Sequence, residues 1–115
     1  MISQGEIVEV PFLLPEGGTK FHPAMVISCP GLQDSGEDLI YAVLISTKNH
    51  YPQYTLELKK EWLNKPMGKQ SYFVTHLVSF FRTKNVRRTN TFVKGEFVDI
   101  VISKIIKNII GWDIE

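Results

Sequence analysis

The sequence has few of the features that mark secreted, membrane-bound or metal-binding proteins. Its one cysteine, Cys29, excludes an intrachain disulfide and fits a reducing compartment. No apolar run approaches the roughly 20 residues that span a bilayer. The first residues, MISQGEIVEV, also lack the basic region of a signal peptide. We therefore expect a cytoplasmic protein with no membrane partner.

Patterns typical of metal and nucleotide sites are missing as well. The histidines His22, His50 and His76 are far apart and form no close ligand pair with Cys29. We expect Cys29 to be an inert thiol on a buried strand. The segment 17–20 has glycines and a lysine but not the spacing of a phosphate-binding P-loop. The sequence therefore predicts neither a metal site nor a cofactor.

Acidic residues are absent from one stretch of the C-terminal half. Residues 1–58 carry two basic and seven acidic side chains, whereas residues 59–115 carry eleven basic and five acidic ones. Residues 79–94 hold five cations and no acid. Such a run is either a solvated face or a phosphate-binding stripe, and both interpretations stay open.

The 115 residues suit one domain, residues 1–115, with a single core. Alternating or β-branched segments between turn residues predict five strands. Pro11 marks an edge or a bulge in the first strand, and residues 15–20 and 31–38 read as loops. The predicted strands cover residues 6–13, 23–29, 39–47, 54–58 and 71–81.

The tail, residues 95–111, has the period of a helix. Polar residues recur every three or four positions, and Gly111 is a suitable C-cap. The opposite, apolar side is wide enough to pack on the protein's own sheet or on a partner subunit. Short strands followed by one terminal helix predict a mainly β fold, a small twisted barrel with a C-terminal helix.

Three motifs stand in a distinctive order. GEIVEVPF starts at Gly5, a glycine-rich loop follows, HPAMVIS covers residues 22–28, and AVLIST ends at Thr47. In this order the segments resemble the PemK/MazF family of ribonuclease toxins. The strand at 54–58 and the strand that begins at Ser71 fit the family order more loosely.

The resemblance implies an SH3-like β-barrel with a C-terminal helix, commonly a homodimer. It implies metal-independent endoribonuclease cleavage of single-stranded RNA within a toxin–antitoxin system, with an antitoxin protein that occupies the RNA groove. The family places a catalytic arginine before the proline, where this chain has His22, and its threonine falls on Ser46, beside Thr47. The resemblance therefore makes His22, Ser46 and Thr47 the catalytic candidates.

The replacement of arginine by histidine has two possible consequences. Arginine supplies charge but is a poor proton shuttle, whereas a histidine, with a reference pKa of about 6.5, can act as acid or base. His22 can thus preserve cleavage, or it can mark a protein that has lost the activity. His50 is either its acid–base partner across a groove or a surface histidine, and we interpret His76 as a satisfied structural residue.

The RNA-binding candidates come from the glycine loop, the end of the third strand and the basic run. They are Gly17, Gly18, Thr19, Lys20, Lys48, His50, Arg82, Lys84, Arg87 and Arg88. An alternative function is a non-catalytic barrel that binds nucleic acid or a partner protein, either an antitoxin or a gyrase-like target. Convergence of His22, His50 and the hydroxyls in one groove favours the enzyme over the binding module.

Overall fold

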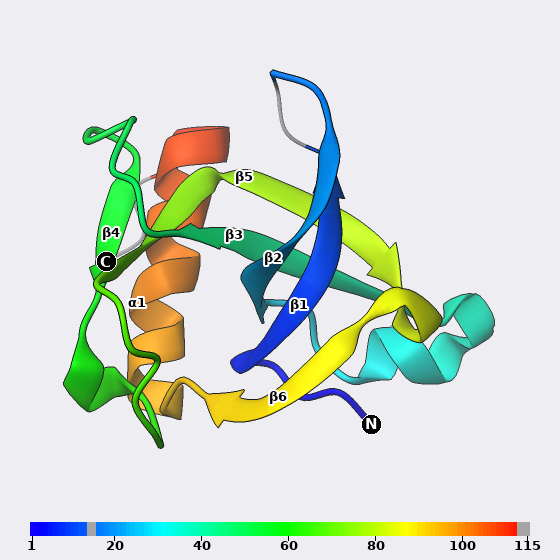
Figure 1. Ribbon diagram of the computed structural model, residues 1–115. Helices are drawn as coiled ribbons and strands as arrows, with labels where there is room; N and C mark the ends of the chain where they lie inside the picture. Colours follow the sequence, from blue (N-terminus) through cyan, green and yellow to red (C-terminus); the bar gives the residue numbers. More distant parts are fainter. Residues whose placement is uncertain (14–15, 113–115) are drawn as a thin grey trace.

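The computed structural model describes residues 1–13 and 16–112, which form one six-stranded antiparallel sheet and a C-terminal helix (Figure 1). The sheet order is β4-β5-β3-β2-β1-β6. The elements are β1 (Glu6–Leu13), β2 (Thr19–Val26), β3 (Leu39–Ser46), β4 (Thr55–Leu58), β5 (Ser71–Arg82), β6 (Arg87–Phe92) and α1 (Gly95–Ile105). The prediction of a small β-barrel with a C-terminal helix is confirmed.

The sheet has an apolar core on each face. Because strand side chains alternate, Ile7 and Met25 pack on one face with Val101 of α1, while Val8 and Val26 belong to a second cluster on the other face. In that second cluster the rings of Phe12 on β1 and Phe81 on β5 lie 5.5 Å apart. Since β1 and β5 are not neighbours in the sheet, this contact shows that the sheet curls around the second core.

An ion pair between the buried Glu6 carboxylate and the half-exposed Arg88 guanidinium joins β1 to β6. The Glu6 side chain is fully buried, and its carboxylate accepts hydrogen bonds from Arg88 Nε at 2.6 Å and Nη2 at 3.0 Å. Arg88 Nη2 also donates to the Met1 carbonyl at 3.3 Å. The hydrogen bond and charge of Glu6 raise the pKa of Arg88 above its ordinary value. The pair therefore fixes the N-terminal segment and the edge strand β6 to β1.

β5 contains a wide irregularity opposite β3. Val43 and Leu44 are consecutive in β3, yet they pair with Val78 and Val74 of β5. Three residues of β5, Thr75, His76 and Leu77, thus lie between the partners of two neighbouring β3 residues. Such a bulge bends the strand and redirects its side chains.

Several local predictions differ from the structure. β2 begins at Thr19 rather than at residue 23. The pairing between β1 and β2 extends as far as Leu13 and Thr19, so residues 19–22 belong to the strand. β2 ends at Val26, so Cys29 lies in a loop and is exposed rather than buried. A helical turn, Gln33–Glu37, interrupts the predicted loop at 31–38.

The strand β6 was not expected from the sequence. Its residues RRTNTF are polar and mostly exposed, so they lack the alternation of a half-buried strand. β6 pairs only with Glu6–Glu9 of β1, through a register shift between Ile7 and Val8. Pro11 lies beyond this pairing, where its missing N–H costs no ladder bond, as its prediction at an edge or bulge requires.

The terminal helix follows the sequence pattern closely. α1 continues as a wider turn to Ile110, and Gly111 ends it with a φ of 87°, a conformation that glycine adopts without a Cβ penalty. Val98, Val101 and Ile105 are buried on the protein's own sheet. Ile109, expected on the buried side, is instead 49% exposed.

Replacing Arg88 by leucine removes two of the hydrogen bonds to the buried Glu6 carboxylate and leaves the one from the Ser3 N–H at 3.1 Å. We expect Arg88→Leu to lower the free energy of unfolding by about 2 kcal/mol, because a buried carboxylate loses its charged partner. Urea denaturation measures the change. The control is Arg87→Leu, where the lost guanidinium lies 3.6 Å from the Phe21 ring centroid at the surface, and we expect a loss of less than about 1 kcal/mol. Equal losses in the two variants would contradict this role of Arg88.

Candidate functional site

A pocket of about 330 Å³ opens between the β1–β2 hairpin loop and the loop that joins β3 to β4. Both loops lie at the same end of the barrel (Figure 1). Five of the residues singled out from the sequence share this pocket, although they come from separate segments. Its lining consists of Glu16, His22, Pro23, Leu44, Ile45, Ser46, Thr47, Lys48, His50, Tyr51, Ser71, Val74 and Leu77.

His22 reaches the pocket from β2. It pairs with Val10 of β1 and shares the sheet face of Ala24 and Val26, whose side chains enter the second core. The Nε2 atom of His22 is covered from solvent and has no hydrogen-bond partner among the described residues. A buried polar atom without a partner is rare in native proteins. His22 therefore lines the pocket with one ring nitrogen left unpaired beneath the pocket wall.

The two hydroxyl residues stand where β3 ends. Ser46 is the last residue of the strand, and its Oγ accepts a hydrogen bond from the Lys48 N–H at 3.1 Å. Strand alternation predicts that only one of Ser46 and Thr47 faces the groove. Both line the pocket, because the chain turns directly after Ser46. Lys48 follows with an exposed side chain, so the turn places a cation beside the two hydroxyls.

The loop after β3 is anchored by its own hydrogen bonds. Thr55 Oγ1 donates to Asn49 Oδ1 at 2.5 Å, and the Tyr51 carbonyl accepts from the N–H groups of Tyr54 at 2.8 Å and Thr55 at 3.1 Å. His50 and Tyr51 therefore enter the pocket from a turn with a defined shape. This arrangement brings His22 and His50 to one site.

The glycine loop contributes a residue that sequence reasoning missed. Glu16 lines the pocket, whereas the predicted contacts Gly17, Gly18, Thr19 and Lys20 are not part of its wall. Gly17 and Gly18 have φ values of 94° and 84°, which turn the chain sharply after Glu16. The signal was present in the sequence, as a carboxylate directly before a glycine pair.

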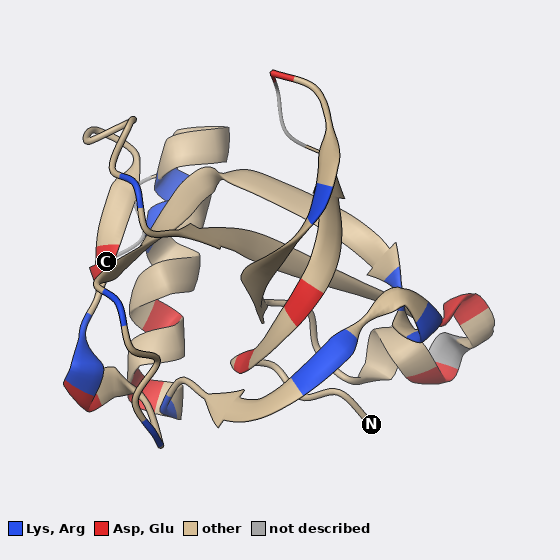
Figure 2. Cartoon of the chain, in the orientation of Figure 1, with Lys and Arg blue, Asp and Glu red and all other residues tan. Residues whose placement is uncertain are grey.

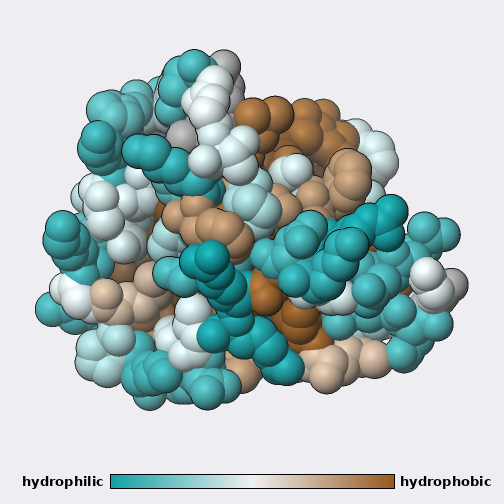
Figure 3. All heavy atoms as spheres, turned by 45° about the vertical axis from the view of Figure 1, so that its right-hand side comes forward, coloured by the Kyte–Doolittle hydropathy of each residue, from teal (hydrophilic) through white to brown (hydrophobic). Residues whose placement is uncertain are grey.

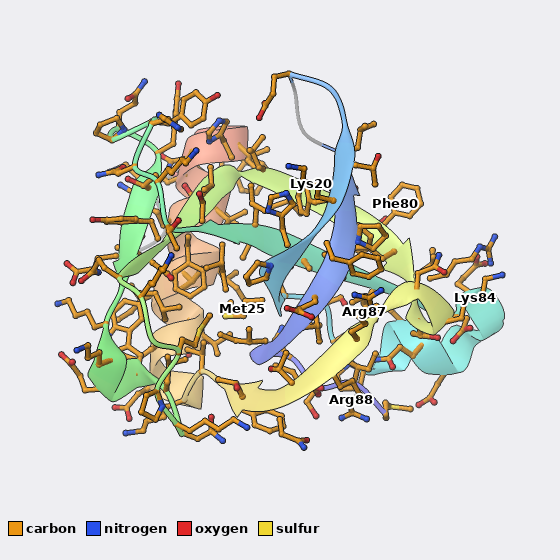
Figure 4. The ribbon with its side chains drawn as sticks, viewed as in Figure 1. Lys20, Met25, Phe80, Lys84, Arg87 and Arg88 are labelled. Atoms are coloured by element: carbon orange, nitrogen blue, oxygen red, sulfur yellow. The ribbon has the colours of Figure 1, made fainter. Side chains whose placement is uncertain are left out.

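The basic run lies elsewhere on the barrel. Lys84, Arg87 and Arg88 gather toward β6, apart from Lys20 on the hairpin (Figures 2 and 4). None of Arg82, Lys84, Arg87 and Arg88 lines the pocket, and Arg88 is held by Glu6. The face of Figure 3 is mainly hydrophilic, with apolar side chains in patches between polar ones. An RNA-binding role for this run stays a prediction.

His76 forms a layer behind the pocket. Its ring lies 5.0 Å from the Tyr51 ring, edge to face, and 4.6 Å from the Tyr54 ring. Burial lowers the pKa of His76 from its ordinary value. The sequence predicted a satisfied structural histidine, but Nδ1 is covered and has no partner among the described residues.

The pocket combines groups for proton transfer with groups for anion binding. Two imidazoles and a carboxylate can exchange protons, and an ammonium and two hydroxyls can hold a phosphate. Across residues 1–13 and 16–112, no group of three or more histidine, cysteine or acidic side chains is arranged to hold a metal ion. Within the same residues, no helix is both long and apolar enough to cross a membrane.

Several solved structures share this architecture. MazF from Deinococcus radiodurans superposes with a TM-score of 0.73 at 13% identity, over 96% of this chain and 97% of its own. An endoribonuclease crystallised with its cognate antitoxin from a mycobacterial species gives 0.71 at 10% identity, over the whole of both chains. The Mycobacterium tuberculosis toxin MazF-mt6 gives 0.69 at 10% identity, over 95% and 99%.

These similarities show that the chain has the fold of MazF toxins. The resemblance to the PemK/MazF family, drawn from three short motifs, is confirmed at the level of the fold. No protein-family model matches the sequence, and no curated protein sequence matches it. The activity of this chain therefore has to be argued from its own pocket.

The lowered pKa of His76 predicts a pH dependence of stability. The unfolded chain binds this proton at a higher pH than the native chain does, so stability is lost as pH falls below the unfolded pKa of about 6.5. We expect the free energy of unfolding to fall between pH 7 and pH 5, and to fall less steeply in His76→Gln. Urea titrations at pH 7, 6 and 5 measure both slopes, and parallel curves would contradict the assignment.

Proposed function

We propose that the protein is a toxin-like endoribonuclease that cleaves single-stranded RNA with its own side chains and without a metal ion. The observation that carries this proposal is the shared pocket of His22, Ser46, Thr47, Lys48 and His50. They come from the middle of β2, the end of β3 and the loop that follows. The fold of MazF toxins supports the same class of activity.

The reaction needs one base and one acid. The base removes the proton of a ribose 2′-hydroxyl, whose oxygen attacks the adjacent phosphorus and forms a 2′,3′-cyclic phosphate. The bond from phosphorus to the 5′-oxygen of the next nucleotide breaks, and the acid gives that oxygen a proton. Electrostatic support for the phosphate lowers the barrier further, since negative charge concentrates on its oxygens in the transition state.

His22 is the first of these proton-transfer groups. It lines the pocket, its Nε2 has no partner among the described residues, and an imidazole can act as acid or base. The second group is the imidazole of His50 or the carboxylate of Glu16, both of which line the pocket. Lys48 and the hydroxyls of Ser46 and Thr47 are suited to hold the phosphate. The family has an arginine, and hence a positive charge, at the position of His22. In this chain Lys48 supplies the positive charge.

The basic run serves RNA outside the reaction centre. Arg82, Lys84 and Arg87 are exposed and lie beyond the pocket wall. Cations at a distance from the cleaved bond attract the phosphate backbone and raise the association rate without taking part in the chemistry. Lys20, Gly17, Gly18 and Thr19 flank Glu16 on the hairpin and contact RNA as it enters the pocket.

A partner protein and a second copy of the chain complete the proposal. MazF from Deinococcus radiodurans has been crystallised with MazE, and the mycobacterial endoribonuclease with its cognate antitoxin. This chain exposes Ile109 and Ile110, which are consecutive at the end of its terminal helix, at 49% and 59%. Exposed apolar side chains that lie together are typical of protein interfaces. We expect a homodimer whose RNA groove an antitoxin blocks.

The His22→Ala variant tests the catalytic assignment. We expect purified wild-type protein to cleave single-stranded RNA in EDTA, with a rate that changes between pH 5 and pH 8. His22→Ala should lose about 100-fold or more in kcat, because one proton-transfer group is gone. Lys84→Ala is the matched control, since it removes an exposed cation outside the pocket and should retain kcat. Gel analysis of a labelled RNA follows all three proteins.

Three outcomes would contradict the proposal, and the first would overturn the ribonuclease itself. Folded protein free of antitoxin that cuts no RNA at any pH would favour the alternative, a barrel that binds a partner through the same pocket. Cleavage that survives in His22→Ala would remove His22 from the reaction. Cleavage that requires added metal would contradict the metal-independent mechanism.

The homodimer is tested by sedimentation. One chain has a mass of 13.2 kDa, and we expect wild-type protein to sediment as a dimer of two such chains. Ile109→Lys combined with Ile110→Lys should give a monomer, because two charges would replace apolar surface at the contact. Leu13→Lys, at a more exposed apolar position on the hairpin with 70% exposure, should remain dimeric. A monomeric wild type would contradict the proposal.

A further inference from the structure

Tyr51 is an aromatic side chain at the wall of the pocket with no role in the reaction described above. It is 39% exposed and follows His50 in the anchored loop after β3. The rest of the lining is aliphatic or polar apart from the two imidazoles. Tyr51 is thus the one phenol ring that the described residues present to a ligand in this pocket.

The ring of Tyr51 has two imidazole neighbours. The His76 ring lies 5.0 Å away at an interplanar angle of 77°, and His50 lies 6.4 Å away at 76°. Two T-shaped contacts restrict the orientation of the Tyr51 ring, and 39% of its side chain remains exposed. Because burial lowers the pKa of His76, its imidazole is uncharged at neutral pH and packs as an aromatic ring.

His76 is itself fixed by the bulge in β5. Its ring lies 4.6 Å from the ring of Tyr54, and the Tyr54 carbonyl accepts hydrogen bonds from the Thr75 N–H at 3.1 Å and from the Thr75 hydroxyl. Asn108 Nδ2 donates to Thr75 Oγ1 at 2.6 Å, which ties the same point to the terminal helix. The support behind Tyr51 is therefore rigid from the loop to the helix.

From this geometry we propose that Tyr51 is a stacking platform for a nucleobase of the bound RNA strand, and that His76 is the positioning residue that orients it. The proposal rests on the proposed function, because it names how that RNA is held. Stacking on an aromatic face is available to every base and is the usual way in which proteins hold single strands. A base on Tyr51 sets the adjacent phosphate beside Lys48 and His22 in the same pocket.

The first test measures binding of a strand that the enzyme cannot cleave. Single-stranded DNA lacks the 2′-hydroxyl and is therefore not cleaved. A DNA oligomer that carries the fluorescent base 2-aminopurine at one position at a time reports where a base stacks, because stacking changes its fluorescence. We expect Tyr51→Leu to bind about tenfold more weakly and to lose the fluorescence change. Tyr51→Phe should behave as wild type, because it keeps the ring. The matched control is Tyr41→Leu, which removes a tyrosine of 40% exposure outside the pocket.

The second test separates positioning from simple stability. His76→Leu should weaken binding in the wild-type background and have little further effect in Tyr51→Leu, because its contribution passes through Tyr51. His76→Phe should restore binding, since a ring again meets the edge of Tyr51. A merely structural role would lower the melting temperature of both backgrounds and weaken binding additively in the double variant.

The outcomes distinguish this inference from the proposed function. Wild-type protein that cleaves RNA, with Tyr51→Leu binding as tightly as Tyr41→Leu, overturns the platform and leaves the ribonuclease intact. Weak binding in both Tyr51→Phe and Tyr51→Leu assigns the effect to the hydroxyl and overturns stacking. Wild-type protein that neither cleaves RNA nor binds either strand overturns the proposed function and the platform together.

Discussion

The hydrogen bonds of Thr75 hold together the parts on which the site depends. At the bulge of β5, the Thr75 backbone and hydroxyl bond to the Tyr54 carbonyl, and Asn108 of the terminal helix bonds to the same hydroxyl. These contacts join the sheet, the loop that carries His50 and Tyr51, and the helix. Without the three extra residues in β5, His76 would not lie behind Tyr51, and Leu77 would not reach the pocket.

A second constraint divides the basic residues by role. Arg88 looks from the sequence like one member of a cationic stripe, but the fully buried Glu6 carboxylate holds it as part of the fold. Its neighbour Arg87 packs over Phe21, and Lys48 stands alone among the basic residues at the pocket. Arg88 therefore has a structural role in joining β6 to β1, whereas Lys48 is placed for the proposed phosphate contact.

The sequence predicted most of the fold because the strong signals are local. The alternation in β1, the apolar run of β3, the polar period of the terminal helix and its glycine cap were readable from residues close together in the chain. The start of β2 and the whole of β6 were missed, because both depend on pairing with β1 rather than on their own pattern. For such segments, pairing with a distant strand outweighs local β-propensity in determining where a strand forms.

The site was predictable in part for the same reason. The three short motifs named His22, Ser46 and Thr47, and the loop after β3 named Lys48 and His50, all of which line one pocket. Glu16 was marked in the sequence only by the glycine pair that follows it. The support of Tyr51 by His76 was not readable, because it depends on a loop and a bulge that meet only in three dimensions. His76 lies 25 residues beyond Tyr51, and no periodicity links the two.

The central proposal is that single-stranded nucleic acid binds in the pocket between the β1–β2 loop and the β3–β4 loop. The most direct measurement is an NMR titration of the isotope-labelled protein with a DNA strand that it cannot cleave. We expect the largest changes in amide chemical shift at Ser46, Thr47 and Lys48, with smaller changes along residues 82–88. Changes confined to the basic run, with the pocket residues unmoved at saturation, would contradict it.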